Sequence, residues 1–153
     1  MEAYQQNLEW LAENGFRKEW NAEPDSSGKR CVYFSKTEDN CGISLYPNGS
    51  VKGNWTGTMF SWQQNHRPDL LQKIEHFRKI TTIADYEDKV EALDQEITTE
   101  MKKLLEDNSV RATTAYANVE QDGRTNLQVE IKGKQASEVY DHLQKLSRVF
   151  YSS

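Results

Sequence analysis

Hydrophobic residues recur at intervals of three and four over residues 82–107, which predicts one long amphipathic helix. Thr82 and Asp85 form a capping pattern at its start, and Asn108 can end it. At about 1.5 Å per residue the helix is roughly 36–39 Å long, more than the core of a small domain needs. Its apolar stripe consists of Ile83, Tyr86, Val90, Leu93, Ile97, Met101 and Leu104.

Residues 31–56 alternate between apolar and polar positions and predict an antiparallel β-meander. Pro47-Asn48-Gly49 suits a three-residue loop with glycine in the left-handed position, which pairs Cys41 with Trp55. Pairing Lys36 with Cys41 places the preceding strand in the same register. One face of the three strands is then apolar and contains Val32, Phe34, Cys41, Ile43, Leu45, Val51 and Trp55.

Further elements are predicted on both sides of the meander. A first helix carries Tyr4, Leu8 and Leu11 on its apolar side, and a short strand can follow over residues 16–20. Residues 59–62 can form a fourth strand. A further helix begins near Pro68, because proline suits the first helical position, and it buries Leu70, Leu71, Ile74 and Phe77.

Residues 113–132 predict a hairpin around Asp122-Gly123, and two registers remain open. A two-residue loop brings Tyr116 onto the face of Leu127, Val129 and Ile131. A three-residue loop ending at Gly123 instead brings onto that face Ala115, Ala117 and Val119. A last helix follows Gly133 and carries Val139, Leu143, Leu146 and Phe150.

These elements predict an α+β fold, in which an antiparallel β-meander packed by helices is followed by a long amphipathic connecting helix, a β-hairpin and a C-terminal helix. Residues 1–82 are expected to form an α-β-meander-α lobe, and residues 83–108 the long helix. Residues 109–153 are expected to form a β-hairpin-α lobe that shares a core with the rest.

Composition and charge narrow the class of protein. The 153 residues are 36% hydrophobic, and no apolar run approaches the ~20 residues of a membrane span. Residues 1–14 are acidic and amphipathic, unlike a signal peptide, so we expect a cytoplasmic protein without membrane contact. The net charge is −5, and residues 83–108 alone hold nine acidic and three basic residues. This distribution indicates a solvated acidic face and argues against sequence-independent DNA binding, which needs a basic stripe.

Residues that commonly carry chemistry form no recognised motif. Cys31 and Cys41 would lie about 17 Å apart on paired strands, too far for a disulfide, so we expect two thiols, with Cys41 in the core and Cys31 more exposed. The three histidines lack the spacing of a zinc site, and neither a phosphate-binding loop nor a nucleophile elbow is present. We therefore expect no cofactor, no metal and no catalytic residue.

Aromatic and basic residues on and after the meander form one candidate ligand-binding site. Aromatic rings beside cations can stack nucleobases and hold their phosphates. The alternative is that most of these rings close the core. The candidate residues are Tyr33, Tyr46, Lys52, Trp62, His66, Arg67, Lys73 and His76.

The long helix also suggests a homodimer. Its N-terminal half can project beyond a small core and pair with a second copy. The predicted interface consists of Tyr86, Val90, Leu93 and Ile97.

Without a catalytic motif, our first interpretation is a non-catalytic binding protein. It would be a small intracellular adaptor or inhibitor that acts through protein–protein contacts, as many viral accessory proteins do. The alternative is a binder of nucleotides or single-stranded nucleic acid that uses the aromatic and basic surface. A small enzyme of unknown class is the third interpretation.

Overall fold

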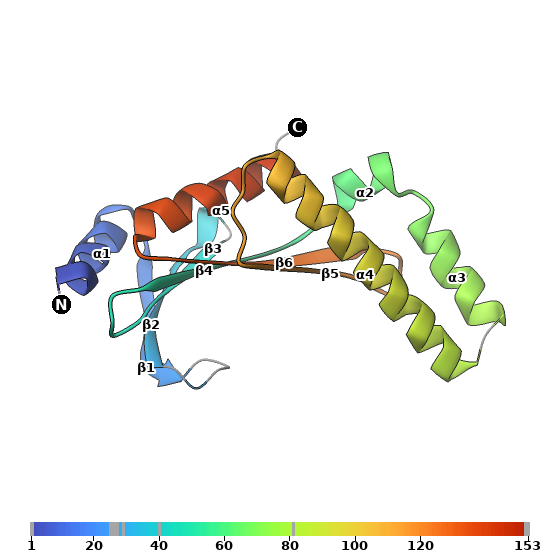
Figure 1. Cartoon of the computed structure of the whole chain (residues 1–153), viewed down its shortest axis with the longest axis horizontal. Helices are drawn as coiled ribbons and strands as arrows, with labels where there is room; N and C mark the ends of the chain where they lie inside the picture. Colours follow the sequence, from blue (N-terminus) through green and yellow to red (C-terminus); the bar gives the residue numbers. More distant parts are fainter. Residues whose placement is uncertain (1, 25–27, 29, 40, 81, 152–153) are drawn as a thin grey trace.

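One antiparallel sheet of six strands is the frame of the protein (Figure 1). The computed structural model describes residues 2–24, 28, 30–39, 41–80 and 82–151. In this part of the chain the strands lie in the order β1-β2-β3-β4-β6-β5, and all neighbours are antiparallel. Their bounds are β1 Arg17–Pro24, β2 Arg30–Lys36, β3 Cys41–Leu45, β4 Val51–Thr58, β5 Thr114–Val119 and β6 Thr125–Gly133.

The helices gather on one face of the sheet and at its β5 edge, and no described helix lies across the other face (Figure 1). The fold is thus the α+β arrangement that the sequence predicts, with the long helix, the hairpin and the C-terminal helix in the expected order. The bounds of the helices are α1 Glu2–Glu13, α2 Phe60–His66, α3 Leu70–Ile80, α4 Ile83–Asp107 and α5 Ala136–Tyr151, with a 3-10 turn at Thr37–Asp39.

The predicted register of the meander is confirmed. Lys36 pairs with Cys41, and Cys41 pairs with Trp55. Gly49 has a φ of 90°, and its amide donates to the carbonyl of Tyr46 at 2.9 Å, so the loop has the predicted three-residue form. This register puts the apolar side chains of all three strands on the face that the helices cover.

The C-terminal hairpin adopts the three-residue loop, which settles the two registers left open by the sequence. The amide of Glu120 donates to the carbonyl of Arg124 at 2.7 Å, and Gly123 has a φ of 83°. The small apolar face of β5 therefore joins the core, whereas Tyr116 points to the other face and is 50% exposed.

The strand predicted at residues 59–62 is wrong. β4 ends at Thr58, and Met59 begins a helical turn in which its carbonyl accepts from the amide of Gln63 at 2.8 Å. The reason lies in β6, which flanks β4 as far as Thr58 and leaves Met59 fully buried at the end of the sheet. The chain turns there and continues as α2.

Cys31 is not the more exposed of the two cysteines, as the sequence suggested. It is 2% exposed and Cys41 is 8% exposed. β1 extends to Pro24 and pairs alongside β2, with Glu23 opposite Cys31. Cys31 therefore lies inside the sheet rather than on an edge strand, and both side chains are buried thiols.

The core lies between the sheet and the helices, with α5 among them. Trp55 of β4 stacks on Phe150 of α5 with ring centroids 5.5 Å apart. Gly53 permits this close approach, because a Cβ at this position would lie 2.5 Å from Val139 Cγ1. Full burial of each large apolar side chain contributes about 1.5–3 kcal/mol, so this layer accounts for much of the stability.

Side chains of α4 occupy the place of a further strand at the β5 edge. The hydroxyl of Thr98 donates to the carbonyl of Ala117 at 3.1 Å and accepts from the Ala117 amide at 2.9 Å. One helical turn earlier, Asp94 Oδ1 accepts from the amide of Val119 at 2.7 Å. An open edge strand can pair with other chains, and α4 satisfies the exposed backbone groups at both residues.

Candidate functional site

The eight residues predicted to bind a ligand fall into two groups in the structure. Tyr33, Tyr46 and Lys52 lie on β2 and beside the β3–β4 loop, whereas the other five lie in the segment from Trp62 to His76. Lys52 lies near the start of β4, and α2 follows its far end, roughly 20 Å away at about 3.4 Å per residue. The structure therefore separates the first three residues from the other five.

Arg67, one of the second group, forms a clamp between the α2–α3 link and α4. The Arg67 side chain is 13% exposed and contacts Asp69 at 3.1 Å, Glu100 at 2.7 Å and Glu96 at 3.5 Å. Its hydrogen bond to Asp69 lowers the pKa of that carboxyl to about 2. The charge of Arg67 is thus matched within the chain.

Other members of this group have contacts of their own. Lys73 forms an ion pair with Asp69 at 3.2 Å. Trp62 and His66 stack one helical turn apart, with ring centroids separated by 5.3 Å, and His76 is exposed on α3.

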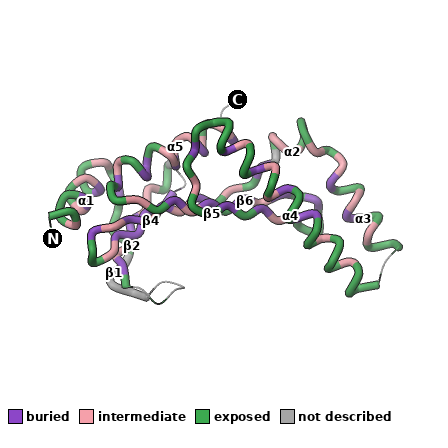
Figure 2. The backbone as a smooth tube through the Cα atoms, in the orientation of Figure 1, coloured by how far each residue is buried: buried purple, intermediate pink, exposed green. Residues whose placement is uncertain are grey.

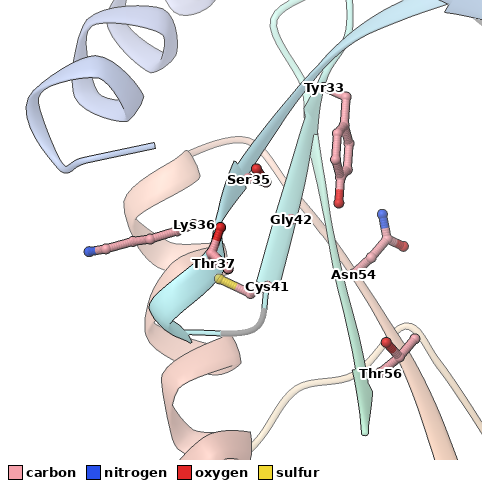
Figure 3. Close-up of a pocket in the computed structure, with 8 residues that line it drawn as sticks. All are labelled: Tyr33, Ser35, Lys36, Thr37, Cys41, Gly42, Asn54 and Thr56. Atoms are coloured by element: carbon pink, nitrogen blue, oxygen red, sulfur yellow. The ribbon is translucent and has the colours of Figure 1, made fainter. Parts of the chain in front are cut away.

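The open face of the sheet carries two adjoining hollows. One has a volume of about 330 Å³ and lies over β2, β3 and β4 (Figure 3). The other, of about 140 Å³, lies over β4, β6 and β5. Asn54 and Thr56 line both, so together the hollows form a single groove across the strands, here named the sheet groove.

Tyr33 and Gly42 shape one end of the sheet groove. The phenol of Tyr33 lies across Gly42, where a Cβ would overlap its oxygen. Figure 3 shows this phenol and the Asn54 amide directed at the same hollow, whereas Lys36 points away. Lys36 instead contacts the hydroxyl of Tyr140 at 3.0 Å. Burial raises the pKa of Tyr33, with smaller contributions from Cys41 and Glu19, so its phenol is protonated at neutral pH.

Two lysines border the sheet groove. Lys52 on β4 lies directly opposite Lys132 on β6, in the row that also contains Ser44 and Tyr33. The ammonium of Lys52 lies 6.0 Å from the ring centroid of Tyr46. Lys132 was not predicted as a site residue, because no local sequence pattern predicts the pairing of β4 with β6.

Carboxylates also lie near the sheet groove. Glu19 of β1 accepts a hydrogen bond from Ser35 at 2.5 Å and pairs with Arg17 at 3.0 Å. The hydrogen bond from Ser35 is the main cause that lowers the pKa of Glu19. Glu130 lines the hollow next to Tyr116. The lining of the groove is therefore mostly polar, and Glu130 places a carboxylate in it.

The residues predicted to form a dimer interface have contacts within the chain. Leu93 and Ile97 are 5% and 0% exposed and belong to the core, while Tyr86 and Val90 are half-buried. Burial on α4 begins at Leu93, so its first turns extend beyond the sheet beside α3 (Figures 1 and 2). The homodimer stays a prediction.

The tip of this projection is apolar. Ile80 ends α3 and is 60% exposed, and Ile83 begins α4 and is 82% exposed. The sequence places Ile83 in the apolar stripe, and helical periodicity does not reveal where the supporting sheet ends. Because α3 and α4 form a helical hairpin, we name residues Ile80 and Ile83 the hairpin tip.

Among the described residues, no three His, Cys, Asp or Glu side chains are grouped so that they hold a metal ion. No helix in the described ranges is long and apolar enough to span a membrane.

The chain was also compared with known proteins, and no family model, curated protein or solved structure matches it.

Proposed function

We propose that this protein is a non-catalytic binding protein, an adaptor or inhibitor that contacts a protein partner through the hairpin tip. The observation that carries the proposal is the exposure of two isoleucines, 60% for Ile80 at the end of α3 and 82% for Ile83 at the start of α4. Exposed apolar side chains that form a contiguous patch mark protein-binding surfaces.

The projection is held firmly at its base, which suits a surface that must be presented to a partner. Arg67 joins the α2–α3 link to α4 through its three carboxylate contacts. The β5–β6 loop packs against α3, where a Cβ at Gly123 would lie 2.7 Å from Leu71 Cβ. Arg78 donates to the carbonyl of Gln121 at 3.0 Å.

The charges near the tip favour a partner of complementary chemistry. The first turns of α4 expose four carboxylates and one lysine, Lys89. A partner with an apolar pocket and a basic rim would match both the isoleucines and these carboxylates. The acidic residues are Asp85, Glu87, Asp88 and Glu91.

The proposal places the protein in the cytoplasm. Its two cysteines are buried thiols, which supports a reducing compartment.

A pull-down from nuclease-treated lysate of the source organism tests the proposal. The double variant Ile80→Asp with Ile83→Asp should lose a protein that the wild-type chain retains, because the apolar contact is removed. Its thermal unfolding should stay close to that of the wild type, since substitutions of exposed side chains change stability by about 0.5 kcal/mol or less.

Ala92→Asp is the matched control, because it makes the same apolar-to-acidic change at an exposed position of α4. This control should retain the partner. Equal capture by the tip variant and the control, or capture that depends on nucleic acid, would contradict the proposal.

A further inference from the structure

The smaller hollow of the sheet groove is lined by a regular patch of side chains. Two neighbouring rows cross β4, β6 and β5 on the open face and line this hollow of about 140 Å³. At about 4.8 Å between strands and about 6.8 Å between rows, the patch measures roughly 10 by 7 Å, an area suited to one small ring. The first row consists of Asn54, Glu130 and Thr114, and the second of Thr56, Gln128 and Tyr116.

Three side chains of this patch have hydrogen-bonding capacity that the chain itself does not use. Asn54 and Gln128 each offer an amide with donors and an acceptor, and Glu130 offers a carboxylate that accepts. Within the described ranges, none of these three side chains hydrogen-bonds to another group of the protein. A ligand with several hydroxyl groups can satisfy all three, because each hydroxyl both donates and accepts.

The charge around the hollow favours a neutral ligand. Its described lining contains the carboxylate of Glu130 and no lysine, arginine or histidine, since Lys52 and Lys132 lie in the next row. Asp94 contacts Tyr116 and adds a second carboxylate at that side. These carboxylates repel an anion, whereas the hydroxyl groups of a neutral ligand can donate to Glu130 in charge-assisted hydrogen bonds.

The ring of Tyr116 supplies an apolar surface beside the polar groups. It is 50% exposed on the open face, and its hydroxyl hydrogen-bonds to the buried carboxylate of Asp94. This contact holds the ring at its tip and leaves the rest of the side chain half exposed. The face of an aromatic ring is electron-rich, so it attracts the slightly positive C–H groups on one side of a sugar ring.

We propose that the smaller hollow binds one neutral six-membered sugar ring. The C–H face of the sugar packs on Tyr116, and its hydroxyls hydrogen-bond to Asn54, Gln128 and Glu130. The site shares no residue with the hairpin tip, so it is separate from the surface proposed to bind a protein partner.

A nuclear magnetic resonance titration of the full nitrogen-labelled chain tests the site. The probes are the methyl glycosides of glucose, galactose and mannose, each added to roughly 100 mM, because a few hydrogen bonds give dissociation constants near the millimolar range. At least one glycoside should shift the amide signals of β4, β5 and β6 in a saturable way. If none of the three does so, the proposal is overturned.

The charge of the ligand provides a second test. The uronic acid that corresponds to the bound sugar carries a carboxylate on the same ring, so Glu130 should weaken its binding about fivefold. Glu130→Gln should remove this difference. Glu106→Gln, which neutralises an exposed carboxylate on α4, is the matched control and should preserve it. Equal or tighter binding of the uronic acid by the wild type would contradict the proposal.

Further variants assign the binding to individual side chains. Tyr116→Ala should weaken it about tenfold, because the sugar loses the ring on which it packs, whereas Tyr116→Phe keeps that ring. Gln128→Ala should weaken binding about two- to twelvefold, the loss of one hydrogen bond. Its control is Gln95→Ala, which removes an exposed amide from α4.

Thermal unfolding of each variant verifies that it is folded. Unchanged binding by Tyr116→Ala, or equal loss in Gln128→Ala and Gln95→Ala, would show that the sugar does not occupy this hollow. A trisaccharide that binds more than about tenfold tighter than its terminal methyl glycoside would overturn the assignment to one ring.

Discussion

The carboxylate of Asp94 accepts a hydrogen bond from the backbone at the edge of the sheet, and its burial there has an electrostatic cost. It is 9% exposed and accepts from the amide of Val119 at 2.7 Å. Burial raises the pKa of Asp94, against the opposing effects of the Val119 amide and the Tyr116 hydroxyl. Burial and the nearby Asp94 likewise raise the pKa of Tyr116. The hydrogen bonds of Asp94, rather than its charge, therefore stabilise the fold at this position.

Two substitutions separate the hydrogen bond from the charge. Asp94→Ala should lower the free energy of unfolding by about 1–3 kcal/mol, because the Val119 amide loses its acceptor. Asp94→Asn should be at least as stable as the wild type at neutral pH, because an amide oxygen still accepts and no charge is buried. Urea denaturation measures both differences.

The pH dependence of this pair has a definite sign. A carboxyl whose pKa is raised in the folded state destabilises the fold when it is ionised. The free energy of unfolding of the wild type should therefore rise relative to that of Asp94→Asn as the pH falls through the carboxyl range. If Asp94→Asn lowered the free energy of unfolding more than Asp94→Ala at neutral pH, this account would be contradicted.

Among the elements, the α3–α4 pair depends on the clamp at its base. Arg67 and Asp69 join the two helices near the sheet, where Leu70 and Ile74 of α3 are fully buried. Beyond this point both helices become more exposed toward the hairpin tip (Figure 2). Changes at the clamp should therefore act on the whole projection.

Acid should release this clamp. The hydrogen bond from Arg67 lowers the pKa of Asp69 from 3.8 to about 2, so the carboxylate stabilises the fold above about pH 4. That stabilisation is lost as the pH falls from about 4 to about 2. In Asp69→Asn, the free energy of unfolding should therefore fall less steeply over this range than in the wild type.

Denaturant unfolding at a series of pH values provides the comparison. Asp107→Asn, which removes an exposed carboxylate at the far end of α4, is the matched control. Parallel pH profiles for the wild type and Asp69→Asn would show that the clamp does not depend on this carboxylate.

Local chemistry explains which elements could be predicted from the sequence. Pro47-Asn48-Gly49 sets the meander register within a few residues, and Thr82 caps α4 by accepting from the amide of Asp85 at 3.2 Å, as its pattern indicated. The turn after β4 was missed, because its position depends on where β6, which is distant in the sequence, begins beside it. Part of the candidate site failed with it, since α2 carries Trp62 and His66 away from Lys52.

Across the whole molecule, the pairing of β4 with β6 joins the N-terminal meander to the C-terminal hairpin. Eight residue pairs join them, from Val51 with Gly133 to Thr58 with Asn126. This contact places Lys132 beside Lys52 and completes the sheet groove. No short-range pattern specifies such a pairing, which is why only half of the lysine pair could be proposed from the sequence.

Two of the four residues predicted to form the homodimer interface, Leu93 and Ile97, belong to the hydrophobic core. Val90→Glu with Leu93→Glu should reduce the free energy of unfolding by more than about 3 kcal/mol, because a charge would be buried at Leu93. Circular dichroism during urea denaturation measures the loss. Light scattering of the wild-type chain, of 17.8 kDa, across a concentration series tests for a dimer. A dimer that dissociates in the double variant without loss of stability would contradict the core assignment.

The β4–β6 pairing also has a consequence for how fast the chain can fold. Bringing Thr58 to Asn126 closes a long loop, and the entropy of closure grows with the logarithm of loop length. The meander, the α3–α4 pair and the β5–β6 hairpin each form from nearby residues and can appear early. We therefore expect the docking of β4 onto β6 to be the slow step. Interactions between β4 and β6 should then govern the refolding rate more than interactions within the meander or within the β5–β6 hairpin.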